Sequence, residues 1–265
     1  MIRLMLTLVA LSCCLTGCKK APTGAAQRQI RILCGSSMSE PAQELGRIFE
    51  EEHAAKVIYD FGGSETLLPR VLVGAEADIF ICHDPFEQKV KEGGKWAGSA
   101  AVGELRPVLL VRPGNPKGIK SVEDLARMPG LKIGLGNPKD STCGQMCVEM
   151  LDRKGLREQV MSKAELQGRT HQEIAMGLIA GPLDAAVVWN FVARLYEGKV
   201  QLVPTDDKYE PIRVTIVGLT QSTNPVLRDA FLELCRTPQA ARIFASYGYT
   251  AAPGGQGPAT KPSAP

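Results

Sequence analysis

Residues 29–37 read QIRILCGSS, an apolar run that stops at a glycine followed by two serines. The branched apolar side chains predict a buried strand, and the small polar residues after them predict a loop that opens a helix. Leu45, Ile48 and Phe49 then recur at the spacing of one face of that helix. This unit of strand, short loop and helix is the element from which the fold class follows.

The same unit recurs along the chain. Residues 56–61 (KVIYDF) predict a second strand before the Gly-Gly-Ser of residues 62–64, and residues 77–82 (ADIFIC) predict a buried strand. Further strands are expected at 106–112, 132–136, 184–189 and 214–219, with a helix over 172–179. Strands that alternate with helices predict an α/β protein with mostly parallel sheets and covering helices.

Helix starts carry their own signals. Ser121 precedes Asp124 by three residues, which predicts a helix capped by Ser121. Residues 137–144 are expected to form a loop before a helix that reaches Leu151, and two terminal helices are expected to begin near Asn224 and Thr237.

Composition excludes several classes of protein. The chain has 265 residues, 44% of them hydrophobic and 22% charged, which is an ordinary globular balance. A net charge of +3 gives no concentrated basic footprint, and 5% aromatic residues argue against a stacking platform, so no nucleic-acid partner is expected. No internal apolar run reaches the ~18 residues of a membrane-spanning helix.

The two ends of the chain are expected to lie outside the fold. Residues 1–17 combine a basic start, a short apolar run and small residues, which is typical of a signal peptide. The ending Leu-Thr-Gly-Cys resembles the lipobox of bacterial lipoproteins, which implies lipidation of Cys18 and anchoring on the periplasmic side of a bacterial membrane, inner or outer. An ordinary signal peptide with an incidental cysteine is the alternative. Residues 18–28 predict a flexible linker, and residues 251–265 a disordered tail.

The order of segments over residues 30–250 resembles the periplasmic molybdate-binding protein family, the solute receptors of molybdate ABC transporters. Each matching piece is weak by itself, and their specificity comes from all of them occurring in order. Besides the first strand and its serines, the pieces are residues 60–64 (DFGGS), 77–81 (ADIFI), 111–116 (VRPGNP), 119–125 (IKSVEDL), 134–138 (GLGNP), 183–189 (LDAAVVW) and 222–225 (STNP).

The resemblance implies a type II periplasmic-binding fold with a ligand cleft between two α/β lobes. Lobe one would consist of residues 29–107 and 214–250, and lobe two of residues 108–213. The ligand would be a tetrahedral oxyanion, molybdate or tungstate, delivered to an ABC permease in the membrane. The family further implies a monomer without cofactor or enzymatic activity.

Three loops that follow predicted strands suit an oxyanion: residues 34–39, 62–65 and 141–144. Each opens a predicted helix, and a helix N-terminus offers free N–H groups with a partial positive charge. In open α/β sheets, ligands bind at the carboxyl ends of strands, where these loops lie. Gly62 and Gly63 also allow the backbone to approach a ligand closely.

The resemblance assigns binding roles to individual residues. Ser37 and Ser64 would donate through their hydroxyls, and Cys143 and His171 would occupy positions where the family uses a backbone N–H. Trp189 stands where bacterial members often place a ligand-binding tyrosine. Three simpler roles stay open: Ser37 as a helix cap, the loop of Ser64 as a tight turn, and Trp189 as a packing residue that donates its indole N–H.

Cysteines and histidines gather near the expected cleft, at strand ends and loops: Cys34, Cys82, His83, Cys143, Cys147 and His171. Thiolates and imidazoles are ligands of soft and borderline metals, so a thiophilic metal or another anion is an alternative ligand. The simpler interpretation is that Cys34 and Cys82 are small buried apolar residues.

A catalytic pair is a further alternative. Cys143 near a helix N-terminus would have a lowered pKa, and His171 could act as its base. The chain lacks the sequence motifs of the common hydrolases and nucleotide-binding enzymes, which favours a binding protein. Glu65 and Asp140 are expected near the cleft, where a carboxylate would oppose the binding of an anion.

Overall fold

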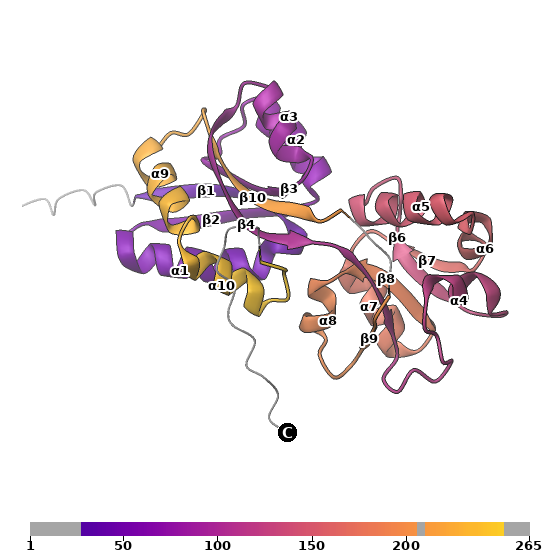
Figure 1. The fold of residues 1–265 in the computed structure, drawn as a ribbon. Helices are drawn as coiled ribbons and strands as arrows, with labels where there is room; N and C mark the ends of the chain where they lie inside the picture. The colour runs from indigo at the N-terminus through magenta and orange to yellow at the C-terminus, as the bar shows by residue number, and fades with distance from the viewer. Residues whose placement is uncertain (1–27, 206–209, 252–265) are drawn as a thin grey trace, which may run out of the picture.

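The computed structural model of the protein describes residues 28–205 and 210–251, which form two lobes, each built on a five-stranded sheet (Figure 1). The expected signal peptide and Cys18 lie outside the described residues, as do all but single residues of the expected linker and tail. Within the described ranges, no helix combines the length and the apolar character needed to cross a bilayer.

The first sheet has the order β2 (Lys56–Gly62), β1 (Gln29–Gly35), β3 (Ile79–His83), β10 (Ile212–Leu219) and β4 (Trp96–Leu105). β1 runs parallel to β2 and β3, whereas β10 is antiparallel to both β3 and β4. Four strands therefore point one way and β10 points the other way.

The second sheet repeats this arrangement with the order β7 (Ala164–Gly168), β6 (Ile133–Gly136), β8 (Ala185–Trp189), β5 (Pro107–Val111) and β9 (Gln201–Val203). β6 runs parallel to β7 and β8, and β5 is antiparallel to β8 and β9. In both sheets the fourth strand is thus the reversed one.

The reversed strands are also the ones that follow a passage between the lobes. The chain leaves the first sheet after Leu105 and enters the second at Pro107, with only Arg106 between them. It leaves the second sheet after Val203 and returns at Ile212. The first lobe therefore combines an early and a late segment of the chain, and the fold is the two-lobe fold that the family resemblance implies.

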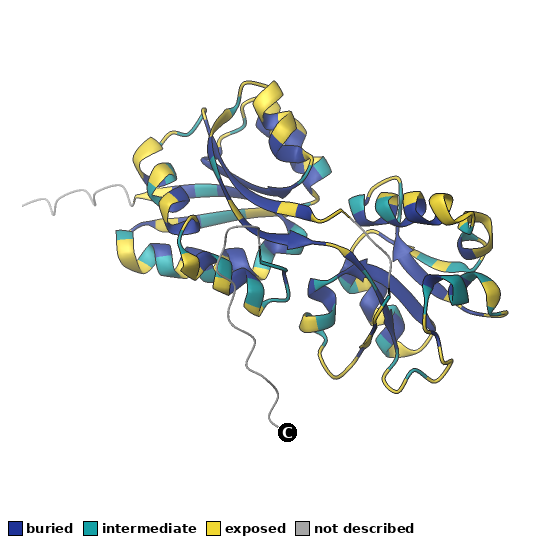
Figure 2. Cartoon of the chain, viewed as in Figure 1, coloured by how far each residue is buried: buried dark blue, intermediate teal, exposed yellow. Residues whose placement is uncertain are grey.

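Helices cover both sheets and bury the inner strands, whereas the edge strands β2, β7 and β9 have only one buried residue each (Figure 2). The first lobe carries the short 3-10 helix η1 (Ser36–Met38), α1 (Ser39–His53), α2 (Ser64–Leu72), α3 (Phe86–Glu92), α9 (Pro225–Cys235) and α10 (Pro238–Ser246). The second carries α4 (Val122–Arg127), α5 (Thr142–Lys154), α6 (Arg157–Met161), α7 (His171–Ala180) and α8 (Phe191–Leu195).

Capping confirms most of the predicted helix starts. The Ser121 hydroxyl accepts a hydrogen bond from the Asp124 backbone N–H at 3.2 Å, and the Asn224 side chain accepts one from Leu227 at 3.3 Å. α10 follows Thr237, but that hydroxyl donates to the carbonyl of Leu234 and caps nothing. α5 begins at Thr142, so the expected loop of residues 137–144 is shorter than predicted.

The start of α5 is fixed by close backbone contact with β6. A Cβ atom on Gly144 would lie 2.2 Å from the carbonyl oxygen of Gly136, well inside contact distance. Only glycine at position 144 lets the first turn of this helix rest on the end of the strand. The same approach holds the N-terminus of α5 at the edge of the sheet where β6, β7 and β8 end.

We expect Gly144→Ala to destabilise the protein by about 1–3 kcal/mol, because the added methyl overpacks a rigid backbone contact. Alanine has a higher helix propensity than glycine, so a purely local effect would have the opposite sign. Urea unfolding followed by circular dichroism measures the change. Gln145→Ala, at the exposed neighbouring position, is the control; equal stability of the two variants would contradict the packing argument.

Candidate functional site

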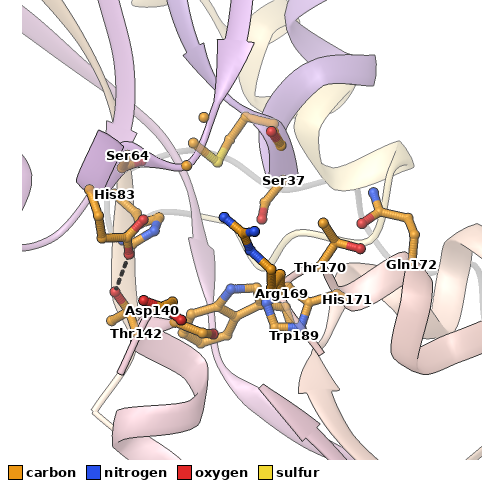
Figure 3. Close-up of a pocket in the computed structure, with 16 residues that line it drawn as sticks. Ser37, Ser64, His83, Asp140, Thr142, Arg169, Thr170, His171, Gln172 and Trp189 are labelled. Atoms are coloured by element: carbon orange, nitrogen blue, oxygen red, sulfur yellow. Dashed lines mark hydrogen bonds between the residues drawn. The ribbon is translucent and has the colours of Figure 1, made fainter. Parts of the chain in front are cut away.

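A cavity of about 100 Å³ lies between the lobes, at the carboxyl ends of strands from both sheets (Figure 3). Its volume suits a small ion or molecule better than a drug-sized ligand. The residues that line it are Gly35, Ser36, Ser37, Met38, Gly63, Ser64, Glu65, His83, Asp140, Ser141, Thr142, Arg169, Thr170, His171, Gln172 and Trp189.

The first lobe contributes two helical N-termini to the cavity. β1 ends at Gly35, and η1 starts directly with Ser36 and Ser37. β2 ends at Gly62, and α2 starts with Ser64. In both places the sequence turns from strand to helix through glycine and serine, so the first backbone N–H groups of each helix lie at the cavity wall.

The second lobe contributes two more. Ser141 caps α5 by accepting from the N–H of Gly144 at 3.3 Å, and Thr170 caps α7 by accepting from the N–H of Glu173 at 3.2 Å. Each cap satisfies a donor in the third helical position and leaves the earlier N–H groups of the turn to other acceptors. Four helical N-termini therefore surround one cavity, an arrangement that favours a negatively charged ligand.

Two buried side chains at the cavity have polar atoms without a protein partner. Ser64 is 3% exposed and His171 is 7% exposed, and neither Ser64 Oγ nor His171 Nδ1 makes a hydrogen bond with any described residue. Buried polar atoms are normally hydrogen-bonded, so Ser64 Oγ and His171 Nδ1 are available to a molecule in the cavity.

Four of the five predicted binding residues line this cavity: Ser37, Ser64, His171 and Trp189. The fifth, Cys143, is fully buried in the hydrophobic core and its side chain does not line the cavity. Only its backbone N–H, in the first turn of α5, belongs to the cavity-facing end of that helix. Trp189 lies at the base of the cavity, in contact with both His83 and His171 (Figure 3).

The cysteines do not form the alternative metal site. The five cysteines among the described residues are buried and form no disulfide with one another, namely Cys34, Cys82, Cys143, Cys147 and Cys235. Within residues 28–205 and 210–251, no group of three or more His, Cys, Asp or Glu side chains could hold a metal ion. The simpler interpretation of Cys34 and Cys82 as small buried apolar residues agrees with their complete burial.

The expected lowering of the Cys143 pKa is also wrong. Burial raises the pKa of the Cys143 thiol well above its ordinary value, because the thiolate would lose its hydration. The N-terminus of α5 does not offset this cost. A neutral, buried thiol is a poor nucleophile, which removes the basis of the catalytic Cys143–His171 pair.

Sequence reasoning missed several lining residues of the second lobe. These include Arg169 and Gln172, which flank the cap of α7. Figure 3 shows the guanidinium of Arg169 reaching into the cavity. Both residues lie within two positions of Thr170, just after β7, whose residues carry no continuous apolar run that would have predicted a strand there.

The cavity is lined by histidine, acidic and basic side chains. Burial lowers the pKa of His171 to about 3, with a further contribution from the neighbouring His83, and burial also lowers the pKa of His83. Both imidazoles are therefore neutral at neutral pH in the empty cavity. Glu65 and Asp140 line the cavity as expected, together with one basic side chain, Arg169.

Glu65 also connects the two lobes. Its carboxylate accepts a hydrogen bond of 3.2 Å from the hydroxyl of Thr142, the first residue of α5 (Figure 3). This carboxylate is thus drawn toward the positive end of a helix in the opposite lobe. The interaction explains how an acidic residue is accommodated beside a cavity that otherwise offers N–H and O–H donors.

Comparison with known proteins assigns the chain to a family. Residues 30–250 match the family model described as bacterial extracellular solute-binding protein. The chain belongs to this family. Its members bind a solute for a transporter and are not enzymes.

Individual relatives are distant but cover most of the chain. The molybdate-binding protein ModA of Azotobacter vinelandii is 28% identical over 236 residues, covering 83% of this chain and 89% of the relative. A putative ABC transporter substrate-binding lipoprotein of Bacillus subtilis is 28% identical over 231 residues, covering 84% and 86%. The structure of the Azotobacter vinelandii periplasmic molybdate-binding protein superposes with a TM-score of 0.70 at 16% identity, covering 84% of this chain and 99% of that one.

The lowered pKa of His171 makes the stability of the solute-binding protein depend on pH. Unfolding returns this imidazole to an ordinary pKa near 6.5, so below about pH 6.5 the unfolded chain binds a proton that the native state does not. We expect the free energy of unfolding of the ligand-free protein to fall on acidification, by up to about 1.4 kcal/mol per pH unit from this group.

Urea unfolding between neutral pH and about pH 5 measures this dependence. The variant His171→Gln should show a shallower loss of stability on acidification, because glutamine does not titrate. The control is His53→Gln, which removes a histidine at the C-terminal end of α1, away from the cavity. An unchanged slope in His171→Gln would contradict the assignment of a neutral, buried imidazole.

Proposed function

We propose that this protein is the extracytoplasmic receptor of an ABC transporter and that it binds a tetrahedral oxyanion, molybdate or tungstate, in the cavity between the lobes. The observation that carries the proposal is the convergence of four helical N-termini on a small cavity that also holds the unpaired Ser64 Oγ. Oxyanions need several directed donors to replace their hydration, and neutral N–H and O–H groups provide them.

The donors come from both lobes, which suits a ligand that is enclosed when the lobes approach. Ser37 and Ser64 belong to the first lobe, while the first turns of α5 and α7 belong to the second. A tetrahedral anion presents oxygen atoms in all directions and can accept from both sides at once. We infer that the ligand bridges the lobes and that a membrane permease recognises the protein in this liganded form.

The names of the relatives support the choice of ligand and of location. Several relatives are named molybdate-binding proteins, including those of Azotobacter vinelandii and Rhodobacter capsulatus. The Bacillus subtilis relative is named a lipoprotein, which agrees with the proposed anchoring through Cys18. We therefore place the protein on the periplasmic side of a bacterial membrane, as a monomer that delivers its ligand to a permease.

Calorimetric titration of the purified protein with molybdate, tungstate, sulfate and phosphate tests the proposal. We expect Ser64→Ala and Ser37→Ala each to weaken molybdate or tungstate binding by about 1–3 kcal/mol, because each removes a donor to a desolvated anion. The loss should be larger for Ser64, whose hydroxyl is more deeply buried.

The matched control is Ser162→Ala, an exposed serine of the second lobe whose hydroxyl donates to the carbonyl of Gln159. It should bind every anion as the wild type does. Wild-type affinity in both Ser37→Ala and Ser64→Ala would remove the site as described, and silence toward all four anions would refute the oxyanion proposal itself.

A further inference from the structure

The hydrogen bonding of His83 determines which of its nitrogen atoms is available to a ligand. His83 ends β3 and is 6% exposed, and its Nδ1 lies 2.8 Å from the backbone carbonyl oxygen of Asp84. A carbonyl oxygen only accepts, so Nδ1 must carry the hydrogen. In the neutral ring the remaining nitrogen, Nε2, is then an acceptor with an exposed lone pair.

This protonation state does not suit an anion. His83 lines the same cavity as Ser64 and the start of α7, and a lone pair on Nε2 would face the oxygen atoms of a bound oxyanion. Those oxygen atoms are acceptors as well, so the contact would be repulsive and would leave both groups unpaired. Protonation of Nε2 changes the contact into a charge-assisted hydrogen bond.

We propose that His83 binds one proton together with the oxyanion and thereby selects a doubly charged anion over a singly charged one of the same shape. This inference rests on the proposed function of the cavity. The proton comes from solvent and goes to Nε2, while Nδ1 keeps its bond to Asp84. The complex then pairs a dianion with an imidazolium that the empty cavity does not contain.

The surroundings of His83 favour a single proton at this position. His171 faces the same cavity, and both imidazoles contact the Trp189 ring, with centroid distances of 6.2 Å from His83 and 5.7 Å from His171. Two imidazolium ions so close together would repel each other, so the first proton opposes a second. The bond from Nδ1 to a carbonyl stabilises the charged form of His83, whereas His171 Nδ1 has no such partner among the described residues.

The other ionisable groups around His83 come from several elements, and their charges are of both signs. The acidic groups are Glu65 of α2, Asp84 next in the chain, Glu87 of α3 and Asp140 before α5. The basic groups are Arg169 before α7 and Arg213 of β10. His171 of α7 and Cys82 of β3 are neutral. Asp84 is already paired with Arg213 at 3.1 Å, and Glu65 accepts from Thr142. The arrival of two negative charges is therefore the change that favours protonation.

Charge selection follows from this coupling. A dianion stabilises the imidazolium more strongly than a monoanion does, because the attraction scales with the ligand charge. Molybdate or tungstate would thus carry a proton into the complex, while perrhenate, a tetrahedral monoanion of nearly the same size, would carry less than one. Neutral donors alone would not distinguish the two ions in this way.

The experiment is calorimetric titration of the purified protein with molybdate and with perrhenate, between about pH 6 and pH 8, in buffers of different ionisation enthalpy. The dependence of the binding enthalpy on the buffer counts the protons taken up. We expect about one proton with molybdate, and an affinity that rises about tenfold for each unit by which the pH falls. With perrhenate, both effects should be smaller.

Three variants identify the group that takes the proton. In His83→Asn, the amide can keep the bond to Asp84 but cannot titrate, so proton uptake should vanish and molybdate binding should become independent of pH. His171→Gln and Glu65→Gln should retain the uptake, and His53→Gln, outside the cavity, is the control. Loss of uptake in Glu65→Gln or His171→Gln with retention in His83→Asn would overturn the assignment to His83.

The outcomes also separate this inference from the proposed function. Tight molybdate binding without proton uptake in the wild type, at any pH in this range, would overturn the role of His83 and leave the oxyanion site standing. Absence of binding by molybdate, tungstate, sulfate and phosphate would refute the proposed function instead. Equal proton uptake with perrhenate and molybdate would overturn the selection by charge.

Discussion

A helix that begins inside a protein leaves its first backbone N–H groups without intrahelical acceptors, and these groups must find partners elsewhere. In this protein, four helical segments begin around one small cavity, two from each lobe. Side-chain caps on Ser141 and Thr170 satisfy only part of the need. The remaining donors define a position at which a ligand with several acceptor atoms lowers the free energy of the whole arrangement. The rest of the structure serves to hold these four N-termini together.

Topology explains why the N-termini meet. In each sheet four strands point the same way, so their carboxyl ends lie along one edge, and the helices that follow begin there. The reversed strands β5 and β10 come directly after the two passages between the lobes. With this arrangement, the edge that carries the strand carboxyl ends in one sheet faces the corresponding edge of the other sheet. A cavity between the lobes is thus a consequence of where the chain crosses, and half of its donors come from each side.

Local sequence was sufficient where an apolar run and its loop carried the signal together. The strand before Ser37 and the loop before Ser64 could be predicted because burial and glycine content are visible in the residues themselves. Arg169 was missed because β7, at the edge of its sheet, has no continuous apolar run to mark it. β4 was missed for a similar reason, since its small residues pair with β10 from far along the chain.

The cysteines show the limit of the same reasoning. Position in a helix start predicts a lowered thiol pKa, but how deeply a side chain is buried depends on tertiary packing that no local pattern contains. For Cys143, loss of hydration outweighs the helix terminus, and the thiol stays neutral. Convergence at the cleft was likewise expected from the strand ends, yet the thiols turn into the core while His83 and His171 line the cavity.

The charge of the cavity wall decides which physical effect can hold an anion there. Glu65 and Asp140 outnumber the one basic side chain, Arg169, so net side-chain charge does not attract an anion. An anion must therefore be held by N–H groups that point at it from the helical N-termini. The strength of these hydrogen bonds depends on their geometry more than on the net charge of the cavity. Glu65 competes with a bound anion for the N-terminus of α5, because its carboxylate accepts a hydrogen bond from Thr142, the first residue of that helix. A ligand bound beside it shares that helix terminus with a fixed negative charge, so the proton that we propose for His83 would add a positive charge opposite a doubly charged ion.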